Sequence, residues 1–509
     1  MIQFKMFELS FKGNPPSGSE AEVDVTAVFK CEKEEKTVKG FYDGDGTYKV
    51  RFLPQQTGHY TWEVSGVVIG SGQEDCTTSK KYHGLIQVEG NHFIYEDGTR
   101  YLPFGTTIYA LAHQSEELIA QTMETLKKAP FNKVRHCVFP KHYDYNHNEP
   151  EFFAFEKDEN GNWDVNRPCF KFWKHFESII DKLAGMDIQS DLILFHPYDR
   201  WGLSKLTMEE NRIYLDYLLR RLSANPNVWW SLANEYDLVF TRKMEDWYAF
   251  EEQVAAEDAY HHLLSNHNCF ALYDFNRKNV THCSIQSTQL YKGTLWQKKF
   301  GKPVIYDECC YEGDLELNWG NLSAFDMADR FWRAFAVGAY ATHGEVYLSD
   351  DEILWWARGG ILKGESPVRI AFLKRILEEL PGALEPWEVT RYISENAGNE
   401  DKNQTPEEKA NNPFLKLINN LTPDLQEMRM EKSAMYTGHY KDEVFLRYFA
   451  RECNSNYHLR LPKTGNYKIE VIDIWEMTRI VYAENTSGDL IVKLPGKPGI
   501  AVLAKSLVT

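Results

Sequence analysis

Two glutamates come directly after apolar segments of this sequence. Asn234-Glu235 follows Val228-Trp-Trp-Ser-Leu-Ala233, and Glu308 follows Pro303-Val-Ile-Tyr-Asp307. Apolar runs of this length are typical of strands buried on both faces. Burial of a carboxyl group at the end of such a strand raises its pKa toward the range in which it can donate a proton near neutral pH. Two carboxyl groups at one edge of a sheet are the groups that break a glycosidic bond, so we predict that Glu235 and Glu308 are catalytic.

The elements that must position these glutamates lie between residue 91 and about residue 380, where strand and helix patterns alternate. The segments with the composition of buried strands are Leu102–Ile108, Lys133–Phe139, Ser190–Phe195, Val228–Leu232, His262–Ser265, Val280–Ile285, Pro303–Tyr306 and Ala341–Leu348. Amphipathic helix patterns lie between them, and Thr207 with Glu210 forms a capping box before one of them. This order predicts an α/β fold, the (β/α)8 TIM barrel. Glu235 and Glu308 would end its fourth and seventh strands, with their carboxyl groups about 5 Å apart.

Patterns of short strands precede and follow the predicted barrel. Residues 1–88 contain roughly alternating segments, Glu22–Val28, Tyr48–Phe52 and Tyr60–Val64, with a hairpin-turn signal at Asp43-Gly-Asp-Gly46. After a polar linker at 395–413, the strand-like segments are Val444–Ala450, Tyr457–Leu461, Tyr467–Ile474, Thr478–Tyr482 and Leu490–Leu494. We therefore predict an N-terminal β-sandwich at 1–88, a catalytic barrel at 89–385, and a linker with a C-terminal β-sandwich at 386–509.

The pair formed by Asn234-Glu235 and Glu308 resembles the catalytic residues of clan A glycoside hydrolases, the cellulase-like superfamily of retaining barrels. The nearer resemblance is to bacterial glycoside hydrolases of the apiosidase-like group. It is carried by Gly105-Thr-Thr107, Phe131-Asn-Lys-Val-Arg135 and Thr342-His-Gly-Glu345, and the flanking regions resemble the β-sandwiches found at both ends of such barrels. The resemblance covers nearly the whole chain. It implies that Glu235 is the acid/base and Glu308 the nucleophile.

Further residues at the predicted strand ends are candidates for binding a sugar. Asn234 can hydrogen-bond to a sugar 2-hydroxyl group, an interaction that strengthens in the transition state. By the resemblance, Arg135 holds the nucleophile ionised, as a nearby cation should. Tyr291 is a loose match to a tyrosine that contacts the nucleophile, and Trp355 is a candidate for the floor of the sugar site. The other candidates end or adjoin predicted strands and are His136, His196, His267, His343 and Glu345.

Several of these candidates have a second interpretation that the sequence leaves open. His196 and His267 could hold loops in place instead of binding a sugar. Glu345 could replace Glu308 as the second carboxylate. Of the adjacent Trp355 and Trp356, at least one must be buried in the core. Asp307 should face away from Glu308, because side chains alternate along a strand.

Composition narrows the classes of partner and cofactor. The chain has 509 residues and a formal net charge of −17, which disfavours nucleic acid and anionic membrane surfaces as partners. Its nine cysteines are scattered and odd in number, which favours free thiols in a reducing cytoplasm over a secreted disulfide framework. Motifs for metal ligands, phosphate loops and serine nucleophiles are missing from the sequence. We expect a cytoplasmic enzyme without cofactor or metal, and a homo-oligomer is an open alternative because relatives with end sandwiches often self-associate.

These observations predict a retaining glycoside hydrolase that acts by double displacement on β-type O-glycosidic bonds of plant-type oligosaccharides or small glycosides. Two alternatives remain. A non-catalytic carbohydrate-binding protein would keep the aromatic floor on a barrel scaffold. An inverting glycosidase would hold its two carboxyl groups roughly 6.5–9.5 Å apart, to leave room for a water molecule.

Overall fold

The computed structural model describes residues 1–389, 405, 407 and 411–507. The chain divides into two compact units. The first consists of Met1–Gln286, Lys302–Leu322 and Ala341–Gly364, and the second of Ser287–Gly301, Ser323–Tyr340 and Glu365–Thr509. The predicted domain boundaries at residues 88 and 385 stay predictions, and most of the predicted linker lies outside the described residues.

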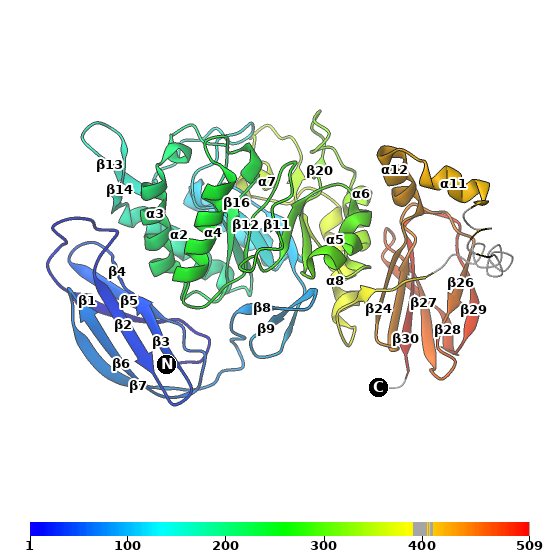
Figure 1. Ribbon diagram of the computed structural model, residues 1–509, viewed down its shortest axis with the longest axis horizontal. Helices are drawn as coiled ribbons and strands as arrows, with labels where there is room; N and C mark the ends of the chain where they lie inside the picture. Colours follow the sequence, from blue (N-terminus) through cyan, green and yellow to red (C-terminus); the bar gives the residue numbers. More distant parts are fainter. Residues whose placement is uncertain (390–404, 406, 408–410, 508–509) are drawn as a thin grey trace. The chain divides into compact units, whose positions relative to one another are not determined.

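An eight-stranded sheet of the described residues carries the candidate site (Figure 1). Its strands, in spatial order, are β17 (Leu264–Ser265), β16 (Val228–Ala233), β15 (Gln189–Phe195), β12 (Lys133–Cys137), β11 (Phe104–Thr107), β21 (Tyr340–His343), β19 (Val304–Glu308) and β18 (Cys283–Gln286). Neighbouring strands pair in parallel, as in Thr107 with Arg135 and Arg135 with Asp191. The two outer strands also approach each other, because the Thr281 amide donates to the Leu264 carbonyl at 2.8 Å. The predicted TIM barrel is confirmed, and each predicted barrel strand is present.

Helices of the first unit follow the strands and bury one face each. They are α1 (Glu116–Leu126), α2 (Phe170–Ala184), α3 (Met208–Leu222), α4 (Met244–Glu257) and the short α7 (Trp355–Arg358), with 3-10 turns η1 (Leu111–His113), η2 (Leu203–Lys205) and η3 (Tyr236–Leu238). α2 packs on β15 and α4 on β16. The predicted capping box forms at the start of α3, where Thr207 Oγ1 accepts from the Glu210 amide at 3.2 Å.

The N-terminal residues form a β-sandwich, as predicted. One sheet contains β1 (Phe7–Lys12), β5 (Thr47–Phe52) and β4 (Phe41–Tyr42), and the other contains β3 (Glu35–Lys39), β2 (Val25–Lys30), β6 (Gly58–Gly66) and β7 (Gly70–Cys76). Phe29 and Phe52, one from each sheet, stack with ring centroids 4.1 Å apart. Three smaller sheets complete the first unit: β8 (Ile86–Glu89), β9 (His92–Tyr95) and β10 (Arg100–Tyr101); β13 (Phe155–Lys157) and β14 (Trp163–Pro168); β20 (Glu312–Gly313) and β22 (Glu345–Val346).

Buried ion pairs join this sandwich to the barrel helices. Arg51 of β5 and Arg221 of α3 each reach the carboxylate of Glu177 on α2, both at 2.7 Å. Arg221 also pairs with Asp43 at 2.8 Å. Both guanidinium groups donate to the two oxygens of this one carboxylate, so the sandwich is attached to the barrel through charges largely removed from water.

The second unit contains a C-terminal β-sandwich, which also agrees with the prediction. Its larger sheet runs in the order β23 (Glu385–Pro386), β24 (Tyr436–Tyr440), β25 (Val444–Tyr448), β30 (Ile500–Ser506), β27 (Tyr467–Asp473) and β28 (Thr478–Thr486), and a second pair is β26 (Asn456–Arg460) with β29 (Asp489–Lys493). Its helical elements are η4 (Leu290–Lys292), α5 (Gly293–Phe300), α6 (Ala324–Phe335), α8 (Ser366–Glu378), α11 (Pro413–Asn419) and α12 (Pro423–Ser433). The last two helices were not predicted. Within the described residues, no helix is both long and apolar enough to cross a membrane.

Candidate active site

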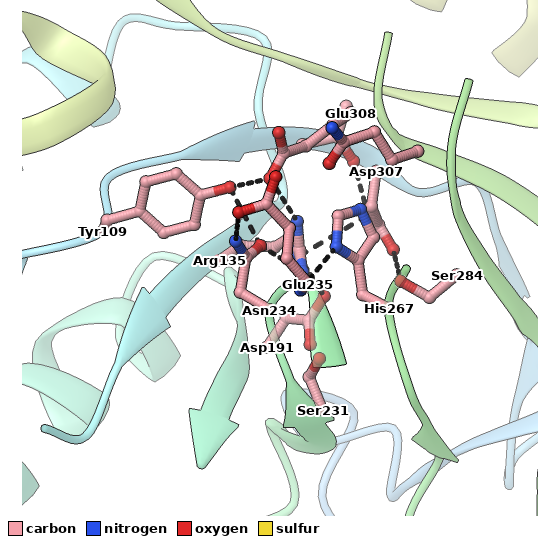
Figure 2. A network of polar contacts seen from close by, with 12 residues as sticks. Tyr109, Arg135, Asp191, Ser231, Asn234, Glu235, His267, Ser284, Asp307 and Glu308 are labelled. Carbon is pink, nitrogen blue, oxygen red and sulfur yellow. Dashed lines mark hydrogen bonds and ion pairs between the residues drawn. The ribbon is translucent and has the colours of Figure 1, made fainter. Parts of the chain in front are cut away.

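Glu235 and Glu308 are linked by a chain of hydrogen bonds at the carboxyl ends of two barrel strands (Figure 2). The Asn234 side chain donates to Glu235 Oε2 at 3.3 Å and accepts from the Tyr109 hydroxyl group at 3.0 Å. The same tyrosine hydroxyl contacts the carboxylate of Glu308. The two glutamates are only 6% and 9% exposed. The structure therefore brings together the two predicted catalytic residues and Asn234.

The backbone at Glu235 has an unusual conformation that turns the chain away from its strand. Its φ and ψ are 53° and 55°, in the left-handed region, and the turn η3 starts immediately after it. A residue with a Cβ atom loses about 1–2 kcal/mol in this conformation. The Glu235 amide donates to Nδ1 of His267 at 3.4 Å, and burial lowers the pKa of His267 well below its usual value, so that its ring is a neutral acceptor.

A buried set of charges lies beneath the two glutamates. Lys133 Nζ bridges Asp191 and Asp307 at 2.8 Å and 2.6 Å. Arg135 Nε lies 3.5 Å from Asp191, and its Nη1 lies 3.9 Å from Glu308 Oε1. Arg135 Nη2 also donates to the Asn234 side-chain oxygen at 3.4 Å. Arg135 therefore contacts the predicted nucleophile, as the resemblance implied.

Asp307 shares this interior with its neighbour Glu308, so the expectation that it faces away was wrong. The pairing of β18 with β19 shifts register after Ile285, where Gln286 pairs with Glu308. A bulge of this kind interrupts the alternation of side chains. Asp307 then accepts from Ser284 at 2.6 Å and Thr342 at 2.8 Å, in addition to Lys133.

Glu308 keeps its proton to a higher pH than an ordinary glutamate. Burial, and then the charge of Glu235, raise the pKa of Glu308 to about 7, although Arg135 and the Tyr109 hydroxyl group oppose this shift. Two interacting carboxyl groups titrate as a pair. At neutral pH the pair can supply both a carboxylate and a carboxylic acid, which are the two forms that glycoside cleavage needs.

Aromatic rings surround the pair. The hydroxyl group of Tyr198 contacts the carboxylate of Glu235, as that of Tyr109 contacts Glu308. Trp356 packs edge-on against Tyr109, with ring centroids 5.9 Å apart, and against Tyr143 at 5.8 Å. Trp319 lies 5.3 Å from Trp356. Rings grouped in this way give a surface on which the C–H faces of a sugar can pack.

Comparison with known proteins identifies the family of the barrel domain. Residues 87–379 match the apiosidase-like catalytic domain, which is more than half of the chain. The chain belongs to the apiosidase-like family. Residues 1–66 and 433–505 of this apiosidase-like protein match two domains of unknown function, DUF5060 and DUF5605. No curated protein gives a significant match.

Solved structures support the same assignment. A candidate glycoside hydrolase from Bacteroides vulgatus ATCC 8482 is 33% identical, covers 99% of each chain and has a TM-score of 0.86. A glycoside hydrolase family 5 protein from the same organism is 13% identical, covers 83% of this chain and 93% of its own, and has a TM-score of 0.60, which shows the shared fold alone. The apiosidase-like protein is thus a glycoside hydrolase with the clan A barrel.

Other predicted site residues have contacts that do not belong to the hydrogen-bonded chain. His136 is fully buried beside Phe176, at 5.6 Å, and burial lowers its pKa to about 3. His196 accepts from the Tyr198 amide at 3.2 Å and contacts the Phe139 carbonyl, so it holds the loop that carries Tyr198. Tyr291, in the second unit, donates to Glu427 at 3.0 Å.

The two tryptophans divide their roles. Trp356 belongs to the aromatic group, whereas Trp355 donates from its indole N–H to Thr106 Oγ1 at 2.8 Å, within the barrel wall. The predicted sugar floor therefore matches Trp356 better than Trp355. The two are adjacent in sequence, and only the four-residue helix α7 decides which ring turns toward Tyr109.

His343 and Glu345 form a separate buried group with Glu312. One ligand atom from each of the three lies within 4.8 Å of the others, so the group could hold a metal ion. Both oxygens of Glu345 already accept backbone amides, from Lys363 at 2.5 Å and Gly364 at 2.8 Å. The ring of His343 stacks on Phe131 at 4.7 Å.

The sequence did not single out Tyr109, Tyr198 or Lys141, although all three lie at the two glutamates. Tyr109 lies two residues beyond the end of β11, at Thr107. Tyr198 lies three residues beyond the end of β15, at Phe195. Their position just beyond predicted strand ends was the available signal, because catalytic groups of such barrels collect there. The same signal was available for Lys141, which lies two residues beyond the predicted strand Lys133–Phe139.

Proposed function

We propose that this apiosidase-like glycoside hydrolase is a retaining enzyme in which Glu308 is the nucleophile and Glu235 the acid/base. The observation that supports this most is the hydrogen-bonded chain from Glu235 through Asn234 and Tyr109 to Glu308. It holds the two carboxyl groups at one place, where burial and the charge of Glu235 raise the pKa of Glu308 to about 7. The proposed substrates are β-linked glycosides of plant-type oligosaccharides.

The mechanism has two displacements. Glu308 attacks the anomeric carbon while protonated Glu235 donates its proton to the leaving oxygen, and a glycosyl ester of Glu308 forms. Glu235, now a carboxylate, removes a proton from water as that water attacks the same carbon. Free Glu308 is regenerated, Glu235 is protonated again, and the sugar keeps its anomeric configuration. Arg135, 3.9 Å from Glu308, stabilises the carboxylate before attack and after release.

Alanine variants test the two roles. Glu308→Ala and Glu235→Ala should each lower kcat on an aryl glycoside by at least about 1,000-fold, because each removes a group that reacts directly. Azide should restore turnover to Glu308→Ala as a glycosyl azide of inverted configuration, and to Glu235→Ala as one of retained configuration. Full activity in both variants would refute the proposal. Glu345→Ala tests the rival carboxylate: azide-dependent recovery there, with none in Glu308→Ala, would transfer the nucleophile to Glu345.

The stereochemistry of the product separates the alternatives. Proton NMR of the first product formed should show the anomer of the substrate. The opposite anomer would indicate the inverting alternative, with the carboxyl groups too far apart for direct attack. Sugar binding without turnover across a panel of nitrophenyl glycosides would favour a non-catalytic binding protein. The panel also identifies the sugar. We further propose a cytoplasmic location, which the odd number of scattered cysteines supports.

A further inference from the structure

Lys141 is a buried cation at the centre of the aromatic group. Its Nζ lies 3.5 Å from the ring centroid of Tyr109, 4.3 Å from that of Tyr198 and 4.9 Å from that of Trp356. The residue is 5% exposed. Two of these rings belong to the tyrosines whose hydroxyl groups contact Glu308 and Glu235. The ammonium group therefore lies on the ring faces of tyrosines that contact both carboxyl groups.

No described residue accepts a hydrogen bond from this ammonium group or forms an ion pair with it. Lys133, the other buried lysine of the site, has two carboxylate partners at 2.6 Å and 2.8 Å. An ammonium group has three N–H donors, and aromatic faces stabilise its charge without supplying an oxygen acceptor. Leaving donors of a buried cation unsatisfied is costly, so the acceptors must come from what enters the site.

We propose that Lys141 binds the substrate, donating hydrogen bonds to an oxygen atom of the sugar whose bond is cleaved, and that this sugar is uncharged. The inference rests on the proposed function only in taking the site to be the one that binds the glycoside. It adds a binding residue and a substrate class to that site.

The charges around Lys141 decide between a neutral and an anionic sugar. Lys133 and Arg135 are matched by Asp191 and Asp307. In the proposed mechanism one of Glu235 and Glu308 is protonated and the other ionised, so the pair carries a single negative charge, which Lys141 balances. A sugar carboxylate would add an uncompensated charge to a buried site, which is strongly unfavourable. A hydroxyl or ring oxygen satisfies the ammonium donors without changing this balance.

The balance holds through both displacements. Before attack the negative charge is on Glu308, and in the glycosyl-enzyme it is on Glu235. Lys141 faces both, along with Arg135, Cys137 and His196. Burial lowers the pKa of Lys141, and the two glutamates counteract this shift. Lys141 in turn lowers the pKa of Glu308.

The test compares Lys141→Met with Lys36→Met. Lys36 is a matched control, because its ammonium group also lies on a tyrosine ring, 4.4 Å from the centroid of Tyr260, but in the N-terminal sandwich. With the neutral aryl glycoside that the enzyme cleaves best, Lys141→Met should lower kcat/KM by about 10- to 100-fold, the range of a hydrogen bond to a charged group. The midpoint of the acid limb of its pH profile should rise, because a cation that favours ionised Glu308 is gone. Lys36→Met should change neither.

Two further experiments separate failure of the Lys141 proposal from failure of the proposed function. Lys141→Arg keeps the positive charge, so the acid limb of its pH profile should have the wild-type midpoint while its KM stays raised. If Lys141→Met fails to fold, Lys141→Gln is used in its place. Binding of the free neutral sugar, followed by calorimetry, should weaken in Lys141→Met even if the wild type hydrolyses nothing, in which case only the proposed function fails. Unchanged sugar affinity, or unchanged kcat/KM and pH profile, overturns the role of Lys141. A glycuronide that is cleaved faster than the matching neutral glycoside overturns the assignment of an uncharged sugar.

Discussion

The hydroxyl group of Tyr109 serves both sides of the site, since it contacts Glu308 and donates to Asn234 at 3.0 Å. Tyr109→Phe keeps the ring that supports Lys141 and removes only this donor. We expect kcat/KM to fall by about 10- to 100-fold, because a hydrogen bond to a charged group contributes roughly 1.5–3 kcal/mol. Steady-state kinetics on an aryl glycoside measures the loss. Tyr214→Phe is the control, a buried tyrosine bonded to the Leu194 carbonyl at 3.3 Å; equal losses in the two variants would contradict a specific role for Tyr109.

The raised pKa of Glu308 predicts how the rate depends on pH. Since this pKa is about 7, Glu308 is protonated below that range and cannot act as the proposed nucleophile. Loss of the proton from the proposed acid/base at higher pH removes the proton donor. A plot of kcat/KM against pH should therefore be bell-shaped, with its acid limb near pH 7. A rate that stays constant from about pH 5 to pH 9 would show that no such pair controls the reaction.

At the scale of elements, the start of α3 depends on its capping box. Thr207 Oγ1 accepts from the Glu210 amide at 3.2 Å, and the Glu210 carboxylate accepts from the Thr207 amide at 2.6 Å. Thr207→Ala should lower the free energy of unfolding by about 1 kcal/mol without changing kcat, because the cap is remote from the reaction. Urea denaturation measures the change. Thr61→Ala, on the exposed surface of β6, should shift stability by less than about 0.5 kcal/mol.

Barrel strands such as Val228–Leu232 and Pro303–Tyr306 could be predicted from the sequence because each is a short apolar run followed by polar residues. The same rule placed Glu235 and Glu308 at strand ends. It could not place Asp307, because a shift of register in the neighbouring pair interrupts the alternation. It did not single out Lys141 among the residues beyond strand ends, because the contacts of Lys141 with Tyr109, Tyr198 and Trp356 depend on segments far apart in the sequence.

The histidines show a second limit of predicting site residues from the sequence. His136 and His343 lie on barrel strands beside polar neighbours, yet their rings pack against Phe176 and Phe131 outside the hydrogen-bonded chain. Neutral imidazole is accepted in such surroundings, and burial lowers the pKa of both rings to about 3. Residue type alone therefore did not separate a histidine that contacts Glu235, as His267 does, from one whose ring packs elsewhere in the barrel.

At the scale of the first unit, Glu177 links the N-terminal sandwich to the barrel. Although burial alone would raise it, the charges of Arg221 and Arg51 lower the pKa of Glu177 to about 2. A glutamate with an ordinary pKa of about 4.3 when unfolded then contributes roughly 3 kcal/mol of stability, present above that pH and lost as the pH falls from about 4 toward 2.

Glu177→Gln should therefore destabilise the unit by about 3–5 kcal/mol, because two buried guanidinium groups lose their common partner. Thermal unfolding at pH 7 measures this loss. At pH 2–3 the difference between variant and wild type should become much smaller, since the wild-type carboxylate is protonated there. Glu209→Gln breaks an exposed pair with Arg212 and should shift stability by less than about 1 kcal/mol. A similar loss in both variants would mean that burial of the cluster is irrelevant.

The left-handed backbone conformation of Glu235 lowers the stability of the fold at a residue proposed to be catalytic. Glycine and asparagine occupy this conformation with less strain than glutamate does. The substitutions that would relax the turn would therefore also remove the proposed proton donor. Selection for heat tolerance alone would favour residues at this position that cannot serve as the acid/base.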